Sequence, residues 1–183
     1  MFRFENLDDT TRRYMLIEVE QAIKTSQLHL SQRFSAKGQE GYPDLLREAV
    51  RTGNEVSLTA ALQQQQCFME REPYGSGTRR VPTNAARTFA EGQFNAFYMR
   101  GICHQAIQAG AQVEVYRAQE AIVVRPISTY QEGQRLDPQQ TLMLLRHSPS
   151  GRHRGPVVPA GFNSGLSLRL PKDTATHQTI RLV

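Results

Sequence analysis

The segment from Thr83 to Gly110 constrains the fold more than any other part of the chain. Apolar and small side chains recur in it every three or four residues, as in a helix with one buried face. They are Ala90, Phe94, Phe97, Tyr98, Gly101, Ile102, Ala106 and Ala109, whereas Glu91, Gln93, Asn95, Arg100, His104 and Gln108 mostly fall off that face. Thr83 or Asn84 can cap the start, and Gly110 can end it. The pattern predicts a long central amphipathic helix.

Gly101 lies in the middle of this predicted helix. Glycine costs about 1 kcal/mol relative to alanine in a helix interior. The cost is tolerable where another backbone packs close, so we expect a near neighbour at this position. We expect the aromatic residues around it to belong to the core and not to a ligand-binding box.

Shorter helices are expected on both sides of this segment. Asp8 or Asp9 can cap a helix that runs to about Leu28, and Leu30 to Gly41 is expected to be extended or a loop. A second helix is expected from Tyr42 to Gly53 with Pro43 in its first turn, and a third from Glu55 to about Gln66. A last helix is expected from Asp137-Pro138 to Arg146.

The remaining segments are expected to be loops and strands. The Gly- and Pro-containing stretch from Glu72 to Pro82 is expected to be a loop that connects two helical halves. After Gly110 the apolar period changes to two, which predicts strands at Val113–Tyr116 and Ile122–Val124 with a hairpin turn at Ala118–Ala121. Together these elements predict an α+β fold, mainly helical, with a small β-hairpin or sheet.

The composition fits one folded domain with an appendage. The chain has 183 residues, of which 39% are hydrophobic and 21% charged. No stretch approaches the roughly 20 apolar residues of a membrane span, and the first residues lack the apolar run of a secretory signal. We therefore expect an intracellular protein without membrane contact.

Catalytic chemistry is not expected from the residue pattern. Cys67 and Cys103 lie far apart and are expected to be free thiols, and the cysteines and histidines lack zinc-site spacing. His104 follows Cys103 directly, so on a helix the two side chains diverge by about 100° and cannot act as a nucleophile and its base. We predict no enzyme, cofactor or metal; an enzyme whose site the sequence does not reveal is left as an alternative.

The excess of positive charge lies at the C-terminal end. Residues 146–183 hold six Lys and Arg against one acidic residue, whereas the two signs balance before them. Of the 22 basic residues 19 are arginines, which favours bidentate, partly buried ion pairs. We divide the chain into a helical α+β domain, 1–146, and a basic, extended C-terminal arm rich in Pro, Gly and Ser, 147–183.

The arm supplies the candidate contact residues. Arg146, Arg152, Arg154 and Arg169 are candidates for contact with a polyanion or a partner. The segment is interpreted as a solvated linker, as an arm that pairs with acidic residues of a neighbouring subunit, or as a ligand of nucleic-acid phosphates. The alternation of Leu166, Leu168 and Leu170 predicts a strand, which is added either to the domain's own sheet or to the sheet edge of another chain.

Four sequence segments resemble known proteins. They are Asn84-Ala85-Ala86, the aromatic run from Ala90 to Cys103, Val115-Tyr116-Arg117-Ala118, and the run from Phe162 to Ser167. In these segments the chain resembles a group of short proteins of tailed bacteriophages and prophages that are of the virion-assembly, head and neck type. The resemblance covers about half of the chain, and no catalytic residue carries over from it.

The resemblance implies a structural role in a virion. It implies a head-to-tail connector (neck or adaptor) or another capsid-associated subunit, which is assembled in the host cytoplasm and joins its neighbours through its arm. Portal, capsid or tail subunits would be its partners, with homo-oligomers and non-specific DNA contact expected. The alternative is a nucleic-acid-binding accessory protein that uses the Arg-rich tail.

Overall fold

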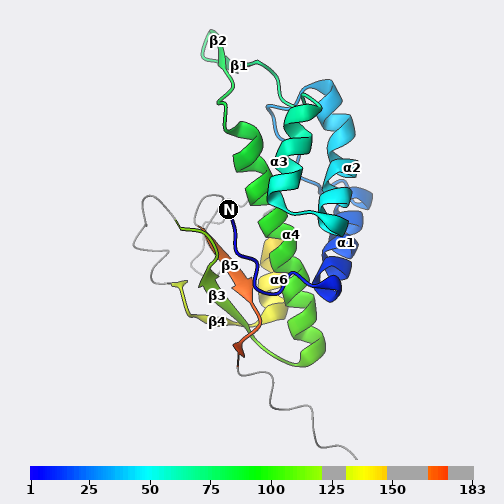
Figure 1. Ribbon diagram of the computed structural model, residues 1–183, viewed down its shortest axis with the longest axis vertical. Helices are drawn as coiled ribbons and strands as arrows, with labels where there is room; N and C mark the ends of the chain where they lie inside the picture. Colours follow the sequence, from blue (N-terminus) through cyan, green and yellow to red (C-terminus); the bar gives the residue numbers. More distant parts are fainter. Residues whose placement is uncertain (121–130, 148–164, 173–183) are drawn as a thin grey trace, which may run out of the picture.

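The computed structural model describes residues 1–120, 131–147 and 165–172. Its helices are α1 (Asp9–Lys24), α2 (Ala36–Thr52), α3 (Glu55–Gln64), α4 (Ala85–Ala109) and α6 (Pro138–His147). Its strands are β1 (Arg71–Tyr74), β2 (Gly77–Arg80), β3 (Val113–Arg117), β4 (Arg135–Leu136) and β5 (Leu166–Arg169). The fold is α+β, as predicted, with the long helix α4 at its centre (Figure 1).

Helix α4 is the element on which most others pack. Helices α1, α3 and α6 and strand β5 contact it directly, and α2 covers α1 and α3 (Figure 1). The largest fully buried side chains come from α1, α2, α3, α4, β5 and the segment before α2, and they form one core: Met15, Phe34, Tyr42, Leu46, Leu58, Leu62, Phe94, Phe97, Tyr98, Ile102, Leu166 and Leu168. The predicted core face of α4 is therefore confirmed from Ala90 to Ala106, whereas Ala109, also placed on that face, is exposed.

The amphipathic character predicted for α4 is wrong over its middle. Gln93, Asn95 and Arg100, expected outside the apolar face, are buried as well. The reason is that neighbours surround this part of the helix on several sides, so its polar residues bond inside the protein. The Asn95 amide, for example, donates to the Leu166 carbonyl at 2.9 Å and accepts from the Ser167 hydroxyl at 2.6 Å.

The close backbone neighbour expected at Gly101 is present. A Cβ at this position would lie 2.9 Å from the Thr11 carbonyl oxygen and 2.9 Å from Cγ of Met15, both on α1. Glycine therefore allows α1 and α4 to approach each other. Gly110 ends α4 in the left-handed conformation, as predicted, whereas Asn84 at the start makes no side-chain capping bond.

The first two helices differ from their predicted bounds. Helix α1 begins as expected, with the Asp8 carboxylate accepting from the Thr11 amide at 2.8 Å, but it ends at Lys24. Helix α2 begins at Ala36 behind the Ser35 cap, so Pro43 lies inside the helix and not in its first turn. The earlier start is anchored from outside the helix, because the Ser35 amide donates to the Cys67 carbonyl at 2.9 Å.

The three-stranded sheet has the order β4-β3-β5 and is antiparallel. Strand β3 was predicted, whereas its predicted partner Ile122–Val124 lies outside the described residues. Strand β5 pairs with β3 so that Val115 lies opposite Leu168, and Leu166 and Leu168 are buried in the core. The predicted arm strand thus belongs to the domain's own sheet, and the folded domain extends beyond residue 146.

The N-terminal residues lie between the helices and the sheet. The Arg3 amide donates to the Ala118 carbonyl at 2.7 Å, and the Phe2 amide donates to the buried Glu55 carboxylate at 2.9 Å. The Phe4 ring packs on Tyr98 with centroids 4.5 Å apart. Within the described part of the chain, no helix combines the length and the apolar character that a bilayer crossing requires.

Candidate functional site

The segment predicted as a loop, Glu72–Pro82, forms an antiparallel hairpin instead. Strands β1 and β2 pair from Arg71 opposite Arg80 to Tyr74 opposite Gly77. Gly75 has a φ of +56°, and Gly at the first central position suits the two-residue turns that connect twisted strands. The sequence carried this information, because a Gly-Ser pair between two short runs is typical of a tight hairpin.

The hairpin projects from the helices and is exposed. Every residue of β2 is exposed, and so is every residue of β1 except Glu72. Figure 1 shows the hairpin extending from one end of the molecule, beyond the start of α4. Its base is fixed, since the Met69 amide donates to the Arg33 carbonyl at 2.9 Å and Phe34 forms an isolated bridge with Phe68.

Glu72 holds two arginines beside the hairpin. Nε of Arg33 lies 2.5 Å from one carboxylate oxygen of Glu72, and Nε of Arg79 lies 2.7 Å from the other. The hydrogen bond from Arg33 lowers the pKa of Glu72; partial burial opposes this, and Arg79 adds to the lowering. The carboxylate therefore stays ionised and orients both guanidinium groups.

The other side chains of the hairpin are also held in place. Arg71 donates from Nε to the Thr78 hydroxyl at 2.9 Å and from a terminal nitrogen to the Thr78 carbonyl at 3.0 Å. The Arg79 guanidinium lies over the Tyr74 ring, 4.3 Å from its centroid. The Arg80 side chain is exposed and makes neither a hydrogen bond nor an ion pair with the described residues.

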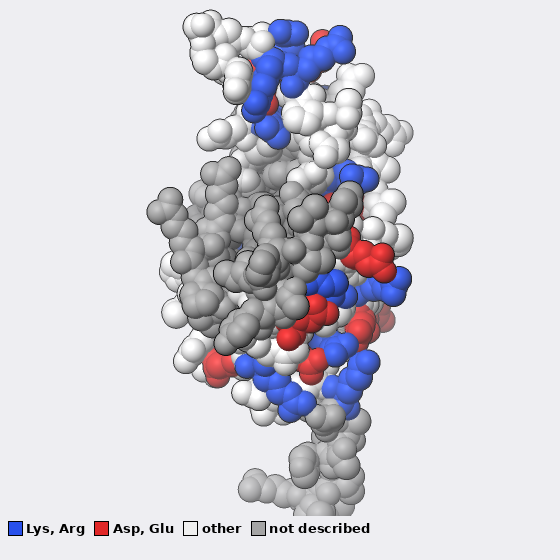
Figure 2. All heavy atoms as spheres, turned by 90° about the vertical axis from the view of Figure 1, so that its left-hand side faces the viewer, with Lys and Arg blue, Asp and Glu red and all other residues white. Residues whose placement is uncertain are grey.

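The net charge of the described residues is concentrated at this hairpin. They hold 18 of the 22 Lys and Arg and 16 of the 17 Asp and Glu, which leaves an excess of two positive charges. Arg33 and residues 70–80 together hold four arginines and two glutamates, so the same excess lies here. Figure 2 shows basic side chains gathered on the hairpin, whereas both signs mix over the lower part of that face.

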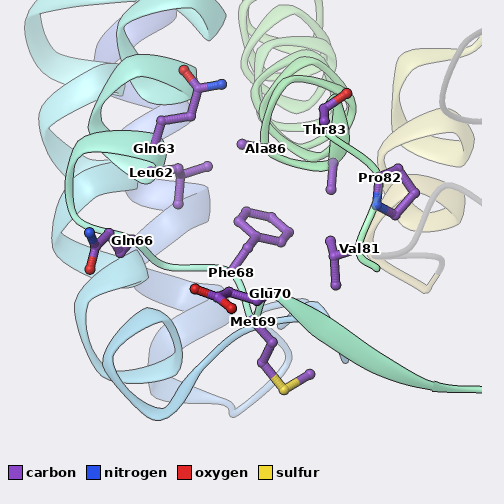
Figure 3. A pocket seen from close by; sticks show the side chains of 11 residues that line it. Leu62, Gln63, Gln66, Phe68, Met69, Glu70, Val81, Pro82, Thr83 and Ala86 are labelled. Atoms are coloured by element: carbon purple, nitrogen blue, oxygen red, sulfur yellow. The ribbon is translucent and has the colours of Figure 1, made fainter. Parts of the chain in front are cut away.

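A groove of about 440 Å³ lies at the base of the hairpin. It is bounded by the end of α3, the chain on both sides of the hairpin and the start of α4; its lining is Leu62, Gln63, Gln66, Phe68, Met69, Glu70, Val81, Pro82, Thr83, Ala85 and Ala86. Figure 3 shows the Phe68 ring projecting between Leu62 and Ala86. Polar and apolar surface contribute about equally to the lining, and the glutamines and Glu70 are among its polar groups.

The two predicted contact arginines that the structure describes lie away from the hairpin. Arg146, at the end of α6, pairs with Glu18 at 2.5 Å, and Arg169, on β5, pairs with Glu114 and, at 2.9 Å, with Glu5. Both arginines are therefore engaged within the domain. Arg152 and Arg154 lie outside the described residues.

Of the predicted strand residues, Leu166 and Leu168 lie in β5, and Leu170, half-buried just after the strand, packs against the core. Their side chains contribute to the domain's interior. This location adds the strand to the domain's own sheet, as its edge strand beside β3.

Sequence reasoning did not anticipate a buried charge cluster on α1, α4 and α6. The Glu18 carboxylate is 2.7 Å from Nε2 of His104, and one of its oxygens is 3.9 Å from a terminal nitrogen of Arg100. Burial raises the pKa of Glu18, but the bonds from His104 and Arg146 and the charges of Arg146 and Arg100 outweigh it, so that the pKa falls to about 2.

Glu18 and Arg100 of this cluster are buried. Arg100 is 4% exposed and also donates to the Leu145 carbonyl at 2.8 Å, and the His104 ring stacks on Tyr14. Its groups bond to one another and to the backbone, and they face no groove that the structure describes. The cluster therefore joins three helices.

The two cysteines are free, as predicted, and both are buried. Burial raises the pKa of both thiols, so they remain protonated at neutral pH. The described residues contain no group of three or more His, Cys, Asp or Glu side chains placed to hold a metal ion. The hairpin and its groove remain the most distinctive surface of the described residues.

The chain matches no protein-family model, and neither a curated protein nor a solved structure gives a significant match to it. Its function has to be inferred from the hairpin, the groove and the charges described above.

Proposed function

We propose that the chain is a non-enzymatic structural subunit of a tailed-phage virion, a head-to-tail connector (neck or adaptor) or a capsid-associated subunit. It joins a portal, capsid or tail protein, or a further copy of itself, through the surface formed by the β1–β2 hairpin and the groove at its base. The bacteriophage resemblance supplies the biological setting of this proposal, and the exposed hairpin supplies its physical support.

The observation that carries the proposal is a hairpin exposed on both faces. A two-stranded hairpin without a covering layer is only marginally stable in water, and this one is fixed to the body at its base and through the Arg33–Glu72 ion pair. Such an element contributes little to the core of its own domain. A neighbouring protein that covers it would bury the surface that the isolated chain leaves in water.

The groove at the base of the hairpin also has features of a protein interface. Interfaces between proteins have an apolar centre and a polar rim, and here Leu62, Phe68 and Met69 contribute apolar lining while Gln63 and Gln66 are polar. Its volume suits one or two side chains of a partner and not a whole helix. The groove therefore serves as an anchor point beside the hairpin.

The proposal also accounts for the engaged arginines of the predicted arm. Arg146 and Arg169 pair within the domain, and β5 completes the domain's own sheet. Assembly through residues 146 and 166–170 would require these contacts to break. The hairpin requires no such rearrangement, because it is already exposed.

The composition of purified virions tests the role. Particles from cells that carry the gene in its native setting would be banded on a density gradient and analysed by quantitative mass spectrometry. We expect the chain in a fixed ratio to the other particle proteins. Its absence from intact particles would overturn the proposal.

A pair of variants tests the surface. Met69→Glu places a charge in the groove, whereas Met143→Glu places the same charge at an exposed methionine on α6, away from the hairpin. We expect Met69→Glu to reduce the amount of the chain in particles severalfold and Met143→Glu to leave it unchanged. Equal incorporation of both variants would contradict the assignment of this surface.

A further inference from the structure

The strand register divides the hairpin side chains between two faces. Directly opposite residues of an antiparallel pair share a face, and successive residues of a strand alternate between faces. Arg71 and Arg80 lie opposite each other and share one face with Pro73 and Thr78; we call it the Arg71 face. Glu72, Tyr74 and Arg79 point to the other side.

The charges on the two faces are balanced differently. On the side of Glu72, the carboxylate pairs with both Arg33 and Arg79. On the Arg71 face, the described residues supply no carboxylate partner to either arginine. Like charges directly opposite each other destabilise a strand pair, so this arrangement is a local conflict that an external anion would remove.

Arg71 is already oriented for such an anion. Its bonds to the Thr78 hydroxyl and carbonyl use Nε and one terminal nitrogen, and leave further N–H groups of the guanidinium directed to solvent. Arg80 keeps all its donors free within the described part of the chain. Guanidinium groups match the geometry of phosphate oxygens, which accept two parallel hydrogen bonds from one fork.

We propose that the Arg71 face binds the sugar-phosphate backbone of duplex DNA, with Arg71 and Arg80 each contacting a phosphate. The concentration of the described net charge at this end of the molecule gives the charge complementarity (Figure 2). A two-stranded ribbon also has the width that the major groove of B-form DNA admits. The binding is independent of base sequence, because the contacts are to the backbone.

The Arg71 face carries no aromatic ring, and this favours duplex DNA over a single strand. Proteins that hold single strands stack the bases on aromatic side chains. The one aromatic ring of the hairpin, Tyr74, points to the opposite face and lies under Arg79. The Arg71 face therefore offers guanidinium groups without a stacking platform.

This inference goes beyond the proposed virion role and does not depend on it. A connector subunit with this face would hold the DNA that passes it, and a host accessory protein would use the same face. It places a DNA contact on the hairpin, whereas Arg146 and Arg169 of the predicted contact set are already paired with carboxylates.

Fluorescence anisotropy with a labelled 20-base-pair duplex and the full chain tests the proposal, from about 25 to 200 mM KCl. We expect wild-type binding that weakens with salt, since each phosphate contact contributes about −0.9 to the slope of log K against log salt. The Arg71→Ala/Arg80→Ala variant should bind about tenfold more weakly at low salt, with a slope smaller in magnitude by about 2.

Two variants with the same charge change serve as controls. Lys24→Ala/Arg51→Ala removes two exposed cations at other positions, and Arg152→Ala/Arg154→Ala removes two from the arm. Both should retain more affinity and a steeper slope than the hairpin variant, whose fold is checked by its urea midpoint. No binding by the wild type at low salt, equal losses in all three variants, or tighter binding of a single strand of the same length would each overturn the proposal.

Discussion

Two glutamates of this protein each hold two arginines, and their surroundings differ. Glu18 lies between α1, α4 and α6, is 1% exposed, and pairs with Arg100 and Arg146. Glu72 lies on the projecting hairpin and is covered mainly by the side chains of Arg33 and Arg79, which are themselves partly exposed.

The comparison shows that the same ion-pair chemistry has different consequences in the two places. Inside the protein, removing the carboxylate would leave a buried guanidinium without a counter-charge, which is costly. On the hairpin, water replaces a lost partner, so the pair orients cations without contributing much stability. The Glu18 cluster joins helices, whereas the Glu72 cluster holds charged arginines at the surface.

The largest expected effect comes from removing the buried carboxylate. Glu18→Gln should lower the free energy of unfolding by about 3–5 kcal/mol, because Arg100 stays buried without a full counter-charge. Urea denaturation followed by circular dichroism measures this loss. The matched variant Glu72→Gln should leave the midpoint close to that of the wild type, and a similar loss in both variants would remove the distinction between the clusters.

The pH dependence of stability should also separate the clusters. In the folded protein the pKa of Glu18 is lowered from 4.5 to about 2, so its carboxylate contributes stability above about pH 4.5. That contribution is lost as the pH falls through the folded pKa, and the difference corresponds to about 3 kcal/mol. The gap in unfolding free energy between the wild type and Glu18→Gln should narrow between pH 5 and pH 2. A constant gap would show that ionisation of Glu18 is not its cause.

A smaller effect is expected at the edge of the buried cluster. Arg146 pairs with Glu18, but its side chain is 44% exposed. Arg146→Ala should therefore cost about 1 kcal/mol, because Arg100 and His104 still face the carboxylate and solvent screens the lost pair. Thermal unfolding measures the change. A loss as large as that of Glu18→Gln would place Arg146 in the interior group.

The smallest effect is expected on the hairpin. Tyr74 is 62% exposed, and its ring contacts the Arg79 guanidinium. Tyr74→Ala removes this contact and should lower the unfolding free energy by about 0.5 kcal/mol, the lower range for an exposed cation–π pair. Chemical denaturation should thus barely distinguish this variant from the wild type. A larger loss would mean that the hairpin tip supports the core.

Local signals in the sequence identified several elements correctly. The period of three to four residues predicted α4, and Gly110 ended it in the expected conformation. Asp137 and Pro138 marked the start of α6, where the Asp137 carboxylate accepts from the Gln140 amide at 2.7 Å. The excess of arginine predicted bidentate, partly buried ion pairs, and Arg33 forms one by donating to both carboxylate oxygens of Glu72. Each prediction depended on residues close in sequence or on composition.

The errors had two different origins. The hairpin was misread as a loop although its Gly-Ser turn was present, because its strands are short and lack apolar alternation. The start of α2 was placed too late because Pro43 suggested a first turn, whereas the anchor at Ser35 is a bond to Cys67, which is distant in sequence. The first error ignored a local signal; the second concerned a contact that no local signal carries.

The sequence by itself determined the α+β class, the central helix, the free thiols and the abundance of arginine ion pairs. Periodicity and capping residues reflect interactions over a few residues, and composition is a property of the whole sequence, so a single sequence shows all three. Only the tertiary structure decided which arginines are engaged and which are exposed. Arg100 and Arg146 are buried or paired because distant residues bring Glu18 between them, whereas Arg71 and Arg80 face water because the strand register turns them away from Glu72.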